Sequence, residues 1–435
     1  MLRKLKQLKS LFDSIRKIRP VNRPTTAMRP VTSALLGLLV LMAGPVGADV
    51  DNKPVDSKPA AEQSAIIDYK ERFLPVVARH GMVVGTEQLA TEAGIGILQE
   101  GGNAVDAAVA TGFALAVTYP RAGNLGGGGF MLIHLAEEAR QVFIDYRETA
   151  PAAASRDMFV LANGETDYQR AYFSHQSSGV PGTVAGLLYA LENYGSMSRQ
   201  QVLAPAIALA EQGIPVSFSI AYEFEARGQR LRRNPEALRL YFKADGSTYQ
   251  IGDIWRQPDL AWTLRQIADK GKAGFYQGEV AQRIATEMEA GNGLITAQDL
   301  AGYKAVEREP IRGNFREFEI VSAPPPSSGG IHILQILNLL ENENLAALGH
   351  NSAAYLHLLA ESMKLAYADR SEYLGDPDYA DIPTAALIDK AYAKRQRQLI
   401  DPVRATPSNE ISPGGQLAVE SGETTHYNVA DRDGN

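Results

Sequence analysis

The chain has 435 residues, of which 45% are hydrophobic and 21% are charged, and its formal net charge is −7. This length and balance are those of an ordinary globular protein that can bury a sizeable core. The sequence contains no cysteine, which excludes disulfides, thiol catalysis and cysteine-ligated metal sites.

Residues 1–48 are predicted to be a secretory signal peptide. Residues 1–30 hold nine basic residues and one acid, an apolar run follows over 33–43, and small residues lead to Ala48. That order is typical of a signal cleaved after Ala48, and the apolar run is shorter than the roughly 20 residues of a membrane span. We therefore expect a periplasmic or secreted protein without stable membrane insertion. An uncleaved anchor is the alternative, and a start at Met28 would give a conventional signal.

Removal of the signal peptide makes the protein more acidic. The 43 basic and 50 acidic residues become 34 and 49, which is a net charge of −15. A chain of this charge is not expected to bind nucleic acid.

Residues 49–70 are predicted to be a flexible tether, because they are polar, contain two prolines and show no periodicity.

Helix and strand patterns alternate after the tether. A helix is predicted over 86–100, where two glycines end it. Asn103 and Asp106 are expected to cap a second helix over 104–119, which is apolar on nearly every side and must be buried.

Strands are predicted next, over 130–135 and 141–146. The remaining predicted elements are helices over 183–193, 203–212 and 353–368 and a strand over 318–323. Elements of both kinds in this order indicate a mixed α and β protein built in layers.

The end of the chain has the pattern of a strand and a turn. Residues 425–430 (THYNVA) favour a strand, and residues 431–434 end in the Asp-Gly pair that typically turns a hairpin. Only Asn435 follows. We therefore expect the returning strand to lie outside this chain and the last strand to be an exposed edge or disordered.

The familiar cofactor and metal motifs are not matched. The glycines before Phe130 are followed by Met131, without the Lys and Ser/Thr of a phosphate loop, and the dinucleotide pattern fails at Gln99. The glycine of residues 431–434 comes too early for a calcium loop, no Gly-x-Ser-x-Gly elbow occurs, and the seven histidines lack zinc spacing. We predict no cofactor and no metal ion.

Glycine-rich stretches stand out instead. Four glycines over 126–129 join the predicted buried helix to an apolar strand. A flexible linker is one interpretation, but glycine at such a junction favours a backbone that passes close to another backbone or to a ligand. Residues 324–330 (PPPSSGG) have the same character, a stiff approach followed by an adaptable turn.

Two charged stretches are also candidates for binding. Arg147 directly follows a predicted strand, where a guanidinium suits recognition of a carboxylate; a surface ion pair is the alternative. The acidic stretch over 367–378 is either a metal site or, as we favour, a helix end and a hydrogen-bonded turn.

Five separated motifs together resemble the γ-glutamyltranspeptidases, or glutathione hydrolases. In chain order they are NLGGGGFM, DYRETAP, PPPSSGG, YADRSEYLGDPD and TTHYNV, and the resemblance runs from about His80 to the last residue. It implies an α+β fold, the four-layer αββα sandwich of the N-terminal-nucleophile hydrolases, incomplete in this chain. It also implies a precursor that cuts itself in front of a threonine to give a large and a small subunit.

By motif match that threonine is Thr424, so the implied autocleavage site is the bond between Glu423 and Thr424. Residues 71–423 are then the large subunit and residues 424–435 the first residues of the small subunit. Thr424 is the implied catalytic nucleophile, and its freed α-amine, with an unperturbed pKa of about 7.7–8.0, can accept the hydroxyl proton. Arg147 matches the family's substrate-binding arginine, which holds the α-carboxylate of the γ-glutamyl group.

The implied activity is transfer of the γ-glutamyl group of glutathione and related compounds to water or to amino acid and peptide acceptors, without a cofactor. The implied protein partner is the chain's own small subunit. Two alternatives stay open: an acylase of the same family that acts on glutaryl-type side chains, and a periplasmic binding protein that has lost catalysis. We expect residues 1–435 alone neither to cleave themselves nor to hydrolyse γ-glutamyl substrates.

Overall fold

The computed structural model describes residues 75–411 and 424–435. The predicted signal peptide, the predicted tether and Glu423 lie outside the described residues. Residues Val76–Asn435 cluster into one unit by their contacts. In the described ranges, no helix combines the length and the apolar character that crossing a membrane requires.

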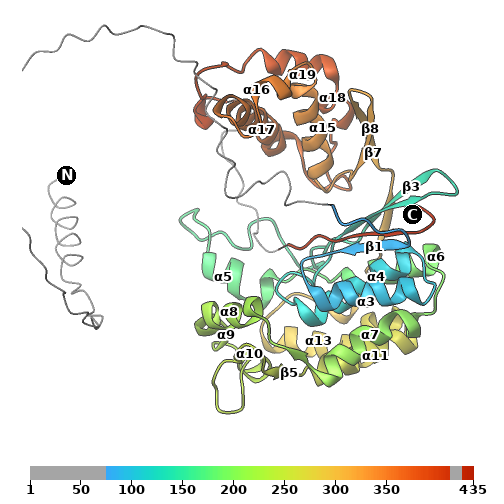
Figure 1. Ribbon diagram of the computed structural model, residues 1–435. Helices are drawn as coiled ribbons and strands as arrows, with labels where there is room; N and C mark the ends of the chain where they lie inside the picture. Colours follow the sequence, from blue (N-terminus) through green and yellow to red (C-terminus); the bar gives the residue numbers. More distant parts are fainter. Residues whose placement is uncertain (1–74, 412–423) are drawn as a thin grey trace, which may run out of the picture. The chain divides into compact units, whose positions relative to one another are not determined.

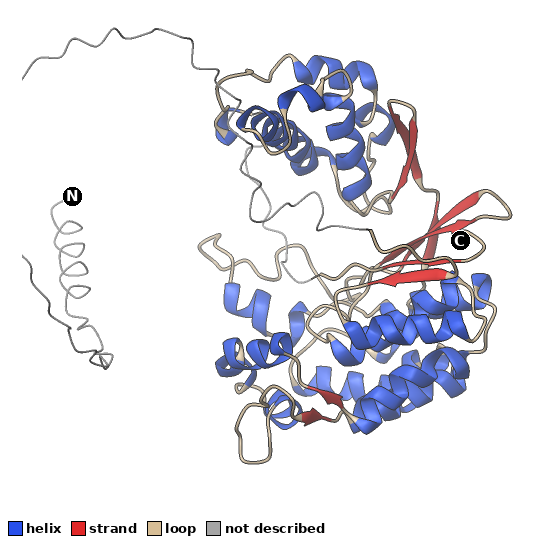
Figure 2. Cartoon of the chain, in the orientation of Figure 1, coloured by secondary structure: helices blue, strands red, loops and turns tan. Residues whose placement is uncertain are grey.

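Short strands alternate with helices along the described chain (Figure 1, Figure 2). The strands are β1 (Gly81–Val84), β2 (Phe130–Leu135), β3 (Arg140–Asp145), β4 (Ile214–Pro215), β5 (Ile254–Trp255), β6 (Val306–Arg308), β7 (Ile311–Phe315), β8 (Phe318–Ser322) and β9 (Asn428–Asp431). The α-helices are α3 (Gln88–Gln99), α4 (Ala104–Thr118), α5 (Tyr168–Phe173), α6 (Thr183–Tyr194), α7 (Arg199–Gln212), α8 (Phe218–Ala226), α9 (Gly228–Leu231), α10 (Pro235–Tyr241), α11 (Pro258–Lys270), α12 (Ala273–Tyr276), α13 (Gly278–Ala290), α14 (Ala297–Gly302), α15 (Gly329–Leu340), α16 (Leu345–Leu348), α17 (Ala353–Tyr373), α18 (Thr384–Leu387) and α19 (Lys390–Arg397).

The strands form small antiparallel sheets. β3 lies between β2 and β6, β1 pairs with β9, β4 with β5, and β7 with β8. In the β2–β3 hairpin Phe130 pairs with Asp145. The predicted strand over 130–135 is therefore confirmed, and the one predicted over 141–146 is displaced by one residue.

Helix α4 is the buried centre of the unit. All of its residues except Ala108 are buried, and it packs against α3, α6, α7 and β9. The Asn103 side chain accepts hydrogen bonds from the first turn, and the Asp106 carboxylate accepts one from the Asn103 amide at 2.9 Å. The predicted capping box and the predicted burial are both confirmed.

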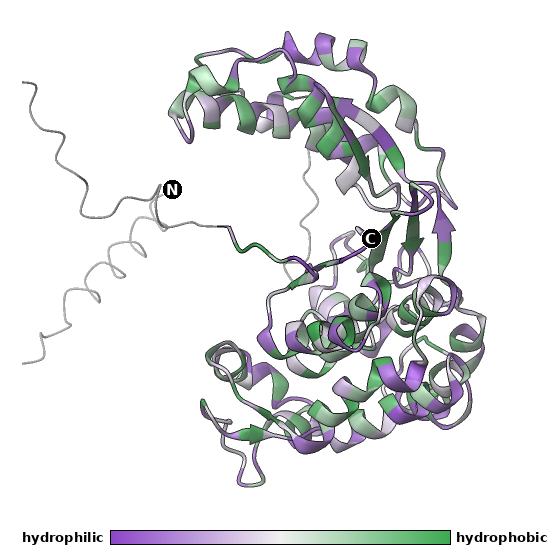
Figure 3. Ribbon diagram, turned by 45° about the vertical axis from the view of Figure 1, so that its right-hand side comes forward, coloured by the Kyte–Doolittle hydropathy of each residue, from purple (hydrophilic) through white to green (hydrophobic). Residues whose placement is uncertain are grey.

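The helices form two layers beneath β1. Figure 1 shows α3 and α4 under β1 and α7 and α11 under them, in agreement with the contacts between α3 and β1, α4 and α7, and α7 and α11. α11 turns its apolar residues inward, among them Leu264 and Ile267, which are fully buried. Hydrophobic and hydrophilic residues share such outer helices (Figure 3), as expected for amphipathic helices that cover a core.

Most other predicted elements agree with the structure. The helix predicted over 203–212 begins earlier, at Arg199, because Ser198 and Gln201 form a capping box there. The helix predicted over 353–368 continues to Tyr373. Around α15, α17 and α19 two smaller hydrophobic clusters lie beside the β7–β8 hairpin, separate from the cluster around α4.

The last strand is shorter than predicted. It begins at Asn428 and not at Thr425, because its partner β1 ends at Val84, which pairs with Asn428. Within the described ranges β9 pairs with β1 alone. Of the two outcomes expected for this strand, an edge strand is observed and disorder is not.

Asp431 fastens the end of the chain to α4. Its carboxylate accepts hydrogen bonds from the amides of Ala104, Asp433 and Asn435, each at 3.0 Å, and from the Asn435 side chain at 2.9 Å. Ala104 is the first residue of α4, where unpaired amides and the helix dipole favour a carboxylate. Burial tends to raise the pKa of Asp431, but these hydrogen bonds outweigh burial and lower the pKa below 3.8.

Replacing Asp431 with alanine should destabilise the protein by about 1–3 kcal/mol, because the amides that it binds lose a charged acceptor. Asp433→Ala is the matched control, since that exposed carboxylate only approaches Arg432 at 3.6 Å. It should change stability by less than about 0.5 kcal/mol. Urea unfolding measures both variants, and equal losses would contradict the role assigned to Asp431.

This contribution should also depend on pH. Because the pKa of Asp431 is lower in the folded than in the unfolded chain, the stabilisation is present above the unfolded value of about 3.9 and is lost as the pH falls through the folded value. The difference in unfolding free energy between wild type and Asp431→Ala should therefore shrink from about pH 7 to about pH 3. A constant difference would argue against a charged contact.

Candidate functional site

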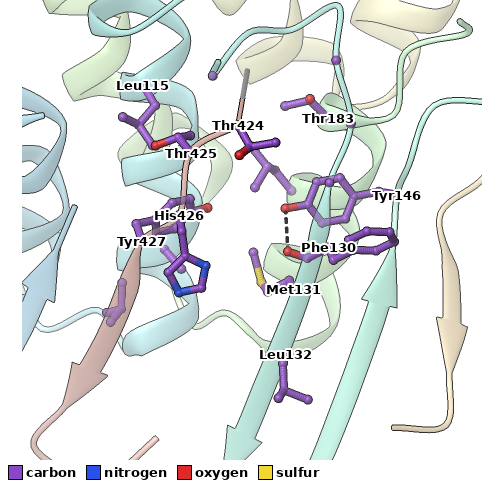
Figure 4. A pocket seen from close by; sticks show the side chains of 18 of the residues that line it. Leu115, Phe130, Met131, Leu132, Tyr146, Thr183, Thr424, Thr425, His426 and Tyr427 are labelled. Atoms are coloured by element: carbon purple, nitrogen blue, oxygen red, sulfur yellow. Dashed lines mark hydrogen bonds between the residues drawn. The ribbon is translucent and has the colours of Figure 1, made fainter. Parts of the chain in front are cut away.

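Thr424 and Arg147 line one cavity of about 780 Å³. Figure 4 shows Thr424 and Tyr146 among the residues that line it. The cavity walls come from the helices α4 and α6, the strand β2, the residues after β3 and the segment over 424–429. The loop that holds the four glycines over 126–129, here called the glycine loop, also contributes. Two predicted site residues that lie far apart in the sequence are thus brought to the same space. Glu423, the third, lies outside the described residues.

The segment over 424–427 leads into β9 and is held at its second and fourth residues. The hydroxyls of Thr425 and Thr86 hydrogen-bond at 2.8 Å. Tyr427 packs on Gly112 of α4, where an added Cβ would lie 2.9 Å from the Tyr427 hydroxyl oxygen. Burial raises the pKa of Tyr427, so it stays a neutral phenol. Thr424 lines the cavity together with Thr425 and Tyr427 (Figure 4).

Tyr146, the residue after β3, forms part of the same wall. Its hydroxyl donates to the carbonyl of Phe130 at 3.3 Å (Figure 4). Its ring fills the space that a side chain at Gly129 or Gly186 would need. Burial, and then two neighbouring tyrosines, raise the pKa of Tyr146 well above 10.0. The phenol therefore stays protonated at neutral pH and cannot serve there as a general base.

Arg147 combines a fixed backbone with an exposed side chain. Its amide donates to Oδ1 of Asp145 at 3.0 Å, and its carbonyl accepts a hydrogen bond from the Tyr303 hydroxyl at 2.8 Å. Among the residues that the structure describes, none forms an ion pair or hydrogen bond with the guanidinium. The surface ion pair that the sequence offered as an alternative is therefore not observed among the described residues. These residues leave the N–H donors of the Arg147 guanidinium free to bind a carboxylate ligand.

The glycine loop owes its composition to close packing. A Cβ on Gly128 would lie 2.5 Å from the carbonyl oxygen of Tyr146 and 2.7 Å from the amide nitrogen of Glu148. On the other side, the carbonyl of Gly127 accepts hydrogen bonds from the amides of Gly182–Thr183 at 2.7 and 3.0 Å. The loop is clamped between the end of β3 and the start of α6. This confirms close backbone approach and excludes a flexible linker.

Three residues that support the cavity wall carried little or no signal in the sequence. A side chain at Gly182 or Gly186 would overlap Tyr146, and Tyr303 holds the carbonyl of Arg147. The two glycines are four residues apart, which places them on one face of a helix, and this spacing in PGTVAG was the only available sign. Tyr303 acts through a long-range contact that no local pattern reveals.

Two of the conspicuous motifs do not line the cavity. In the stretch over 324–330, Gly330 is the second residue of α15 and packs against the backbone of Ala323. In the acidic stretch α17 ends at Tyr373, and the amide of Asp378 donates to Asp376 at 3.0 Å. The favoured helix end and turn are confirmed, and the described ranges contain no group of three His, Asp or Glu side chains that could hold a metal ion.

Comparison with known proteins gives a consistent result. The family model described as gamma-glutamyltranspeptidase matches residues 90–435. The glutathione hydrolase proenzyme of Escherichia coli (strain K12) is 50% identical over 83% of this chain and 62% of its own length. The acylase ACY 1 proenzyme of Pseudomonas sp. (strain V22) is 40% identical over 85% of this chain and 66% of its own length.

A solved structure is similar as well. The crystal structure of Helicobacter pylori γ-glutamyltranspeptidase matches with a TM-score of 0.77 and 44% identity, over 80% of this chain and all of the matched chain. This similarity and the mixture of helices and sheets confirm the predicted α+β fold of the N-terminal-nucleophile type. The present chain spans 62% of the length of the Escherichia coli relative.

Gly128→Ala should destabilise the protein by about 1–3 kcal/mol, because the added methyl group overlaps the backbone on both sides of Arg147. Gly126→Ala is the matched control: its Cβ would meet nothing closer than the Asn124 side-chain oxygen at 3.4 Å. That variant should stay within about 0.5 kcal/mol of wild type. Urea unfolding compares the two, and a tolerated Gly128→Ala would contradict the clamped loop.

Proposed function

The chain belongs to the γ-glutamyltranspeptidase family, and from that premise we propose that it is the precursor of a self-cleaving γ-glutamyltransferase and glutathione hydrolase. One observation carries the proposal: Thr424 and Arg147 line the same cavity. A nucleophile and a cation for a carboxylate are what a γ-glutamyl group requires, since it offers a carbonyl at one end and an α-carboxylate at the other.

Maturation begins when the Thr424 hydroxyl attacks the carbonyl carbon of Glu423. The C–N bond breaks as an ester forms, and the hydroxyl proton passes to the nitrogen, which becomes the free α-amine of Thr424. Water then hydrolyses the ester and leaves a large and a small subunit. The pairing of β9 with β1 and the bond from Ala104 to Asp431 cross this cleavage point, which favours a stable heterodimer.

The freed amine of Thr424 acts as the general base of the mature enzyme. Its unperturbed pKa of about 7.7–8.0 leaves a useful fraction neutral near pH 7, whereas the same nitrogen is a non-basic amide before cleavage. The hydroxyl attacks the γ-carbonyl, cysteinylglycine departs with the proton, and an acyl-threonine remains. Water then releases glutamate, or an amino acid or peptide takes the γ-glutamyl group.

The cavity suits a substrate of this kind. Its volume of about 780 Å³ falls in the range of roughly 300–1,000 Å³ that is usual for small-molecule sites. The guanidinium of Arg147 binds the substrate α-carboxylate through two parallel hydrogen bonds. With the signal peptide predicted over 1–48, the enzyme acts in the periplasm or outside the cell.

An acylase for glutaryl-type amides is the second candidate, because an acylase proenzyme is among the similar proteins. A glutaryl group keeps the carboxylate that Arg147 would bind and lacks the α-amine. Rates with γ-glutamyl-p-nitroanilide and glutaryl-p-nitroanilide separate the two functions. A binding protein without catalysis would instead remain a single band on a denaturing gel.

In the full-length protein, Thr424→Ala should abolish both self-cleavage and activity, because one hydroxyl serves both reactions. Thr424→Ser should retain part of each. Thr425→Ala is the matched control: it removes the hydrogen bond to Thr86 and should leave the cleavage position unchanged. N-terminal sequencing identifies the new end of the small subunit. A sequence that starts at Thr425 would mean that the nucleophile is misassigned.

Arg147→Lys should lower kcat/KM for γ-glutamyl-p-nitroanilide by roughly 30-fold to a few thousand-fold. Disrupting a charge pair that the bound substrate buries costs about 2–5 kcal/mol, and an ammonium keeps the charge but cannot reproduce the planar fork. Self-cleavage should be nearly normal, since it involves no substrate carboxylate.

The specificity of that loss is checked with two further anilides. Glutaryl-p-nitroanilide keeps a free carboxylate and should suffer from Arg147→Lys, whereas butyryl-p-nitroanilide has none and should not. Equal slowing of the butyryl and γ-glutamyl compounds, or blocked self-cleavage, would make Arg147 a structural residue.

A further inference from the structure

The carboxylate of Asp145 connects two arginines. Its Oδ1 accepts a hydrogen bond from the backbone amide of Arg147 at 3.0 Å, and its Oδ2 accepts one from Nε of Arg308 at 2.8 Å. Asp145 ends β3 and Arg308 ends the neighbouring strand β6. The side chains of Asp145 and Arg308 are only 8% and 16% exposed, so the contact is shielded from water.

The rest of the Arg308 guanidinium is occupied by Asp378. Nη1 and Nη2 bind the two oxygens of that carboxylate at 3.0 and 2.9 Å, a bidentate arrangement. Hydrogen bonds to Asp378 and to Asp145 raise the pKa of Arg308, and the bond from Arg308 lowers the pKa of Asp378. The acidic turn that does not line the cavity is thus linked to the end of β3 through Arg308.

Tyr303 holds Arg147 from the opposite side. Its hydroxyl donates to the Arg147 carbonyl at 2.8 Å, and its ring stacks on Tyr276 at 5.7 Å between centroids and 7° between planes. The Tyr276 hydroxyl in turn donates to the carbonyl of Pro181 at 2.8 Å. Both polar backbone groups of Arg147 are therefore fixed by side chains, the amide by Asp145 two residues earlier and the carbonyl by the distant Tyr303.

We propose that Arg308 is a positioning residue that acts through Asp145 to fix the backbone of Arg147, and with it the direction from which the Arg147 guanidinium meets a substrate carboxylate. This inference rests on the proposed function, in which Arg147 binds that carboxylate. Arg308 itself does not line the cavity. Without it, a nearly buried Asp145 loses its counter-charge and can no longer hold the Arg147 amide in one place.

The test uses Arg308→Lys in the full-length, self-cleaving protein. Lysine keeps the charge but cannot bind Asp145 and Asp378 at once through a planar group. A displacement of about 1 Å can cost about 100-fold, so kcat/KM for γ-glutamyl-p-nitroanilide should fall by roughly 10- to 100-fold, mainly through KM. Self-cleavage and the rate with butyryl-p-nitroanilide should stay near wild type.

Arg312→Lys is the matched control. Arg312 lies on β7, is more exposed, and binds Glu319 and Gln141 at 3.0 and 2.6 Å without a contact to Asp145. Its replacement should leave KM for the γ-glutamyl compound unchanged. A rise in KM as large as that of Arg308→Lys would overturn the proposal, because the effect would then not depend on Asp145.

A double variant separates positioning from general stability. Because Arg308 acts through Arg147, adding Arg308→Lys to Arg147→Lys should cost less than about twofold further. A structural role would lower activity in both backgrounds and would slow butyryl-p-nitroanilide as well, which would contradict the proposal.

Tyr303→Phe covers the case in which Arg308→Lys does not fold. It removes one hydroxyl and keeps the stack on Tyr276, and it should give the same carboxylate-selective loss. A loss without substrate selectivity would refute the positioning of the Arg147 backbone. Absence of γ-glutamyl hydrolysis in wild type would refute the proposed function itself. This inference alone would be refuted if Arg147→Lys lowered kcat/KM as predicted while Arg308→Lys and Tyr303→Phe left it unchanged.

Discussion

The backbone at the end of β3 packs tightly against the glycines of neighbouring segments, and the cavity depends on this packing. Gly128 lies against the carbonyl of Tyr146 and the amide of Glu148, so closely that a single methyl group does not fit. Arg147 lies between these two residues and is fixed because its amide donates to Asp145 and its carbonyl accepts a hydrogen bond from Tyr303. Protein interiors of this density transmit a shift in one segment to its neighbours. The exposed guanidinium of Arg147 therefore extends from a rigid base.

The opposite wall depends on the N-terminus of α4. Asn103 and Asp106 cap this helix from within, and Asp431 binds its first amide from the segment that carries Thr424. Gly112 lies further along the same helix and leaves room for Tyr427. The same buried helix thus supports the core and sets the position of the proposed nucleophile, which explains why its sequence is apolar on nearly every side yet contains a glycine.

The sequence predicted the parts of this structure that local rules decide. The capping box at Asn103, the burial of α4 and the bounds of β2 follow from side-chain chemistry and periodicity within a few residues. The start of β9 was wrong by three residues because the partner strand, and not local propensity, determines where pairing begins. The roles of Tyr303 and Arg308 could not be predicted from the sequence, because each depends on a contact with a residue more than a hundred positions away. Arg147 was identified through the resemblance of several motifs, and its fixed backbone became visible only in the structure.

The central claim is that Thr424 is the residue that carries the γ-glutamyl group during turnover. The most direct measurement is rapid mixing of the matured full-length protein with γ-glutamyl-p-nitroanilide, an acid quench during the burst of p-nitroaniline, and peptide mass spectrometry of the small subunit. We predict that one γ-glutamyl group is found on the peptide that begins with Thr424, attached to that residue. A γ-glutamyl group on another residue, or a burst without any covalent adduct, would contradict the account.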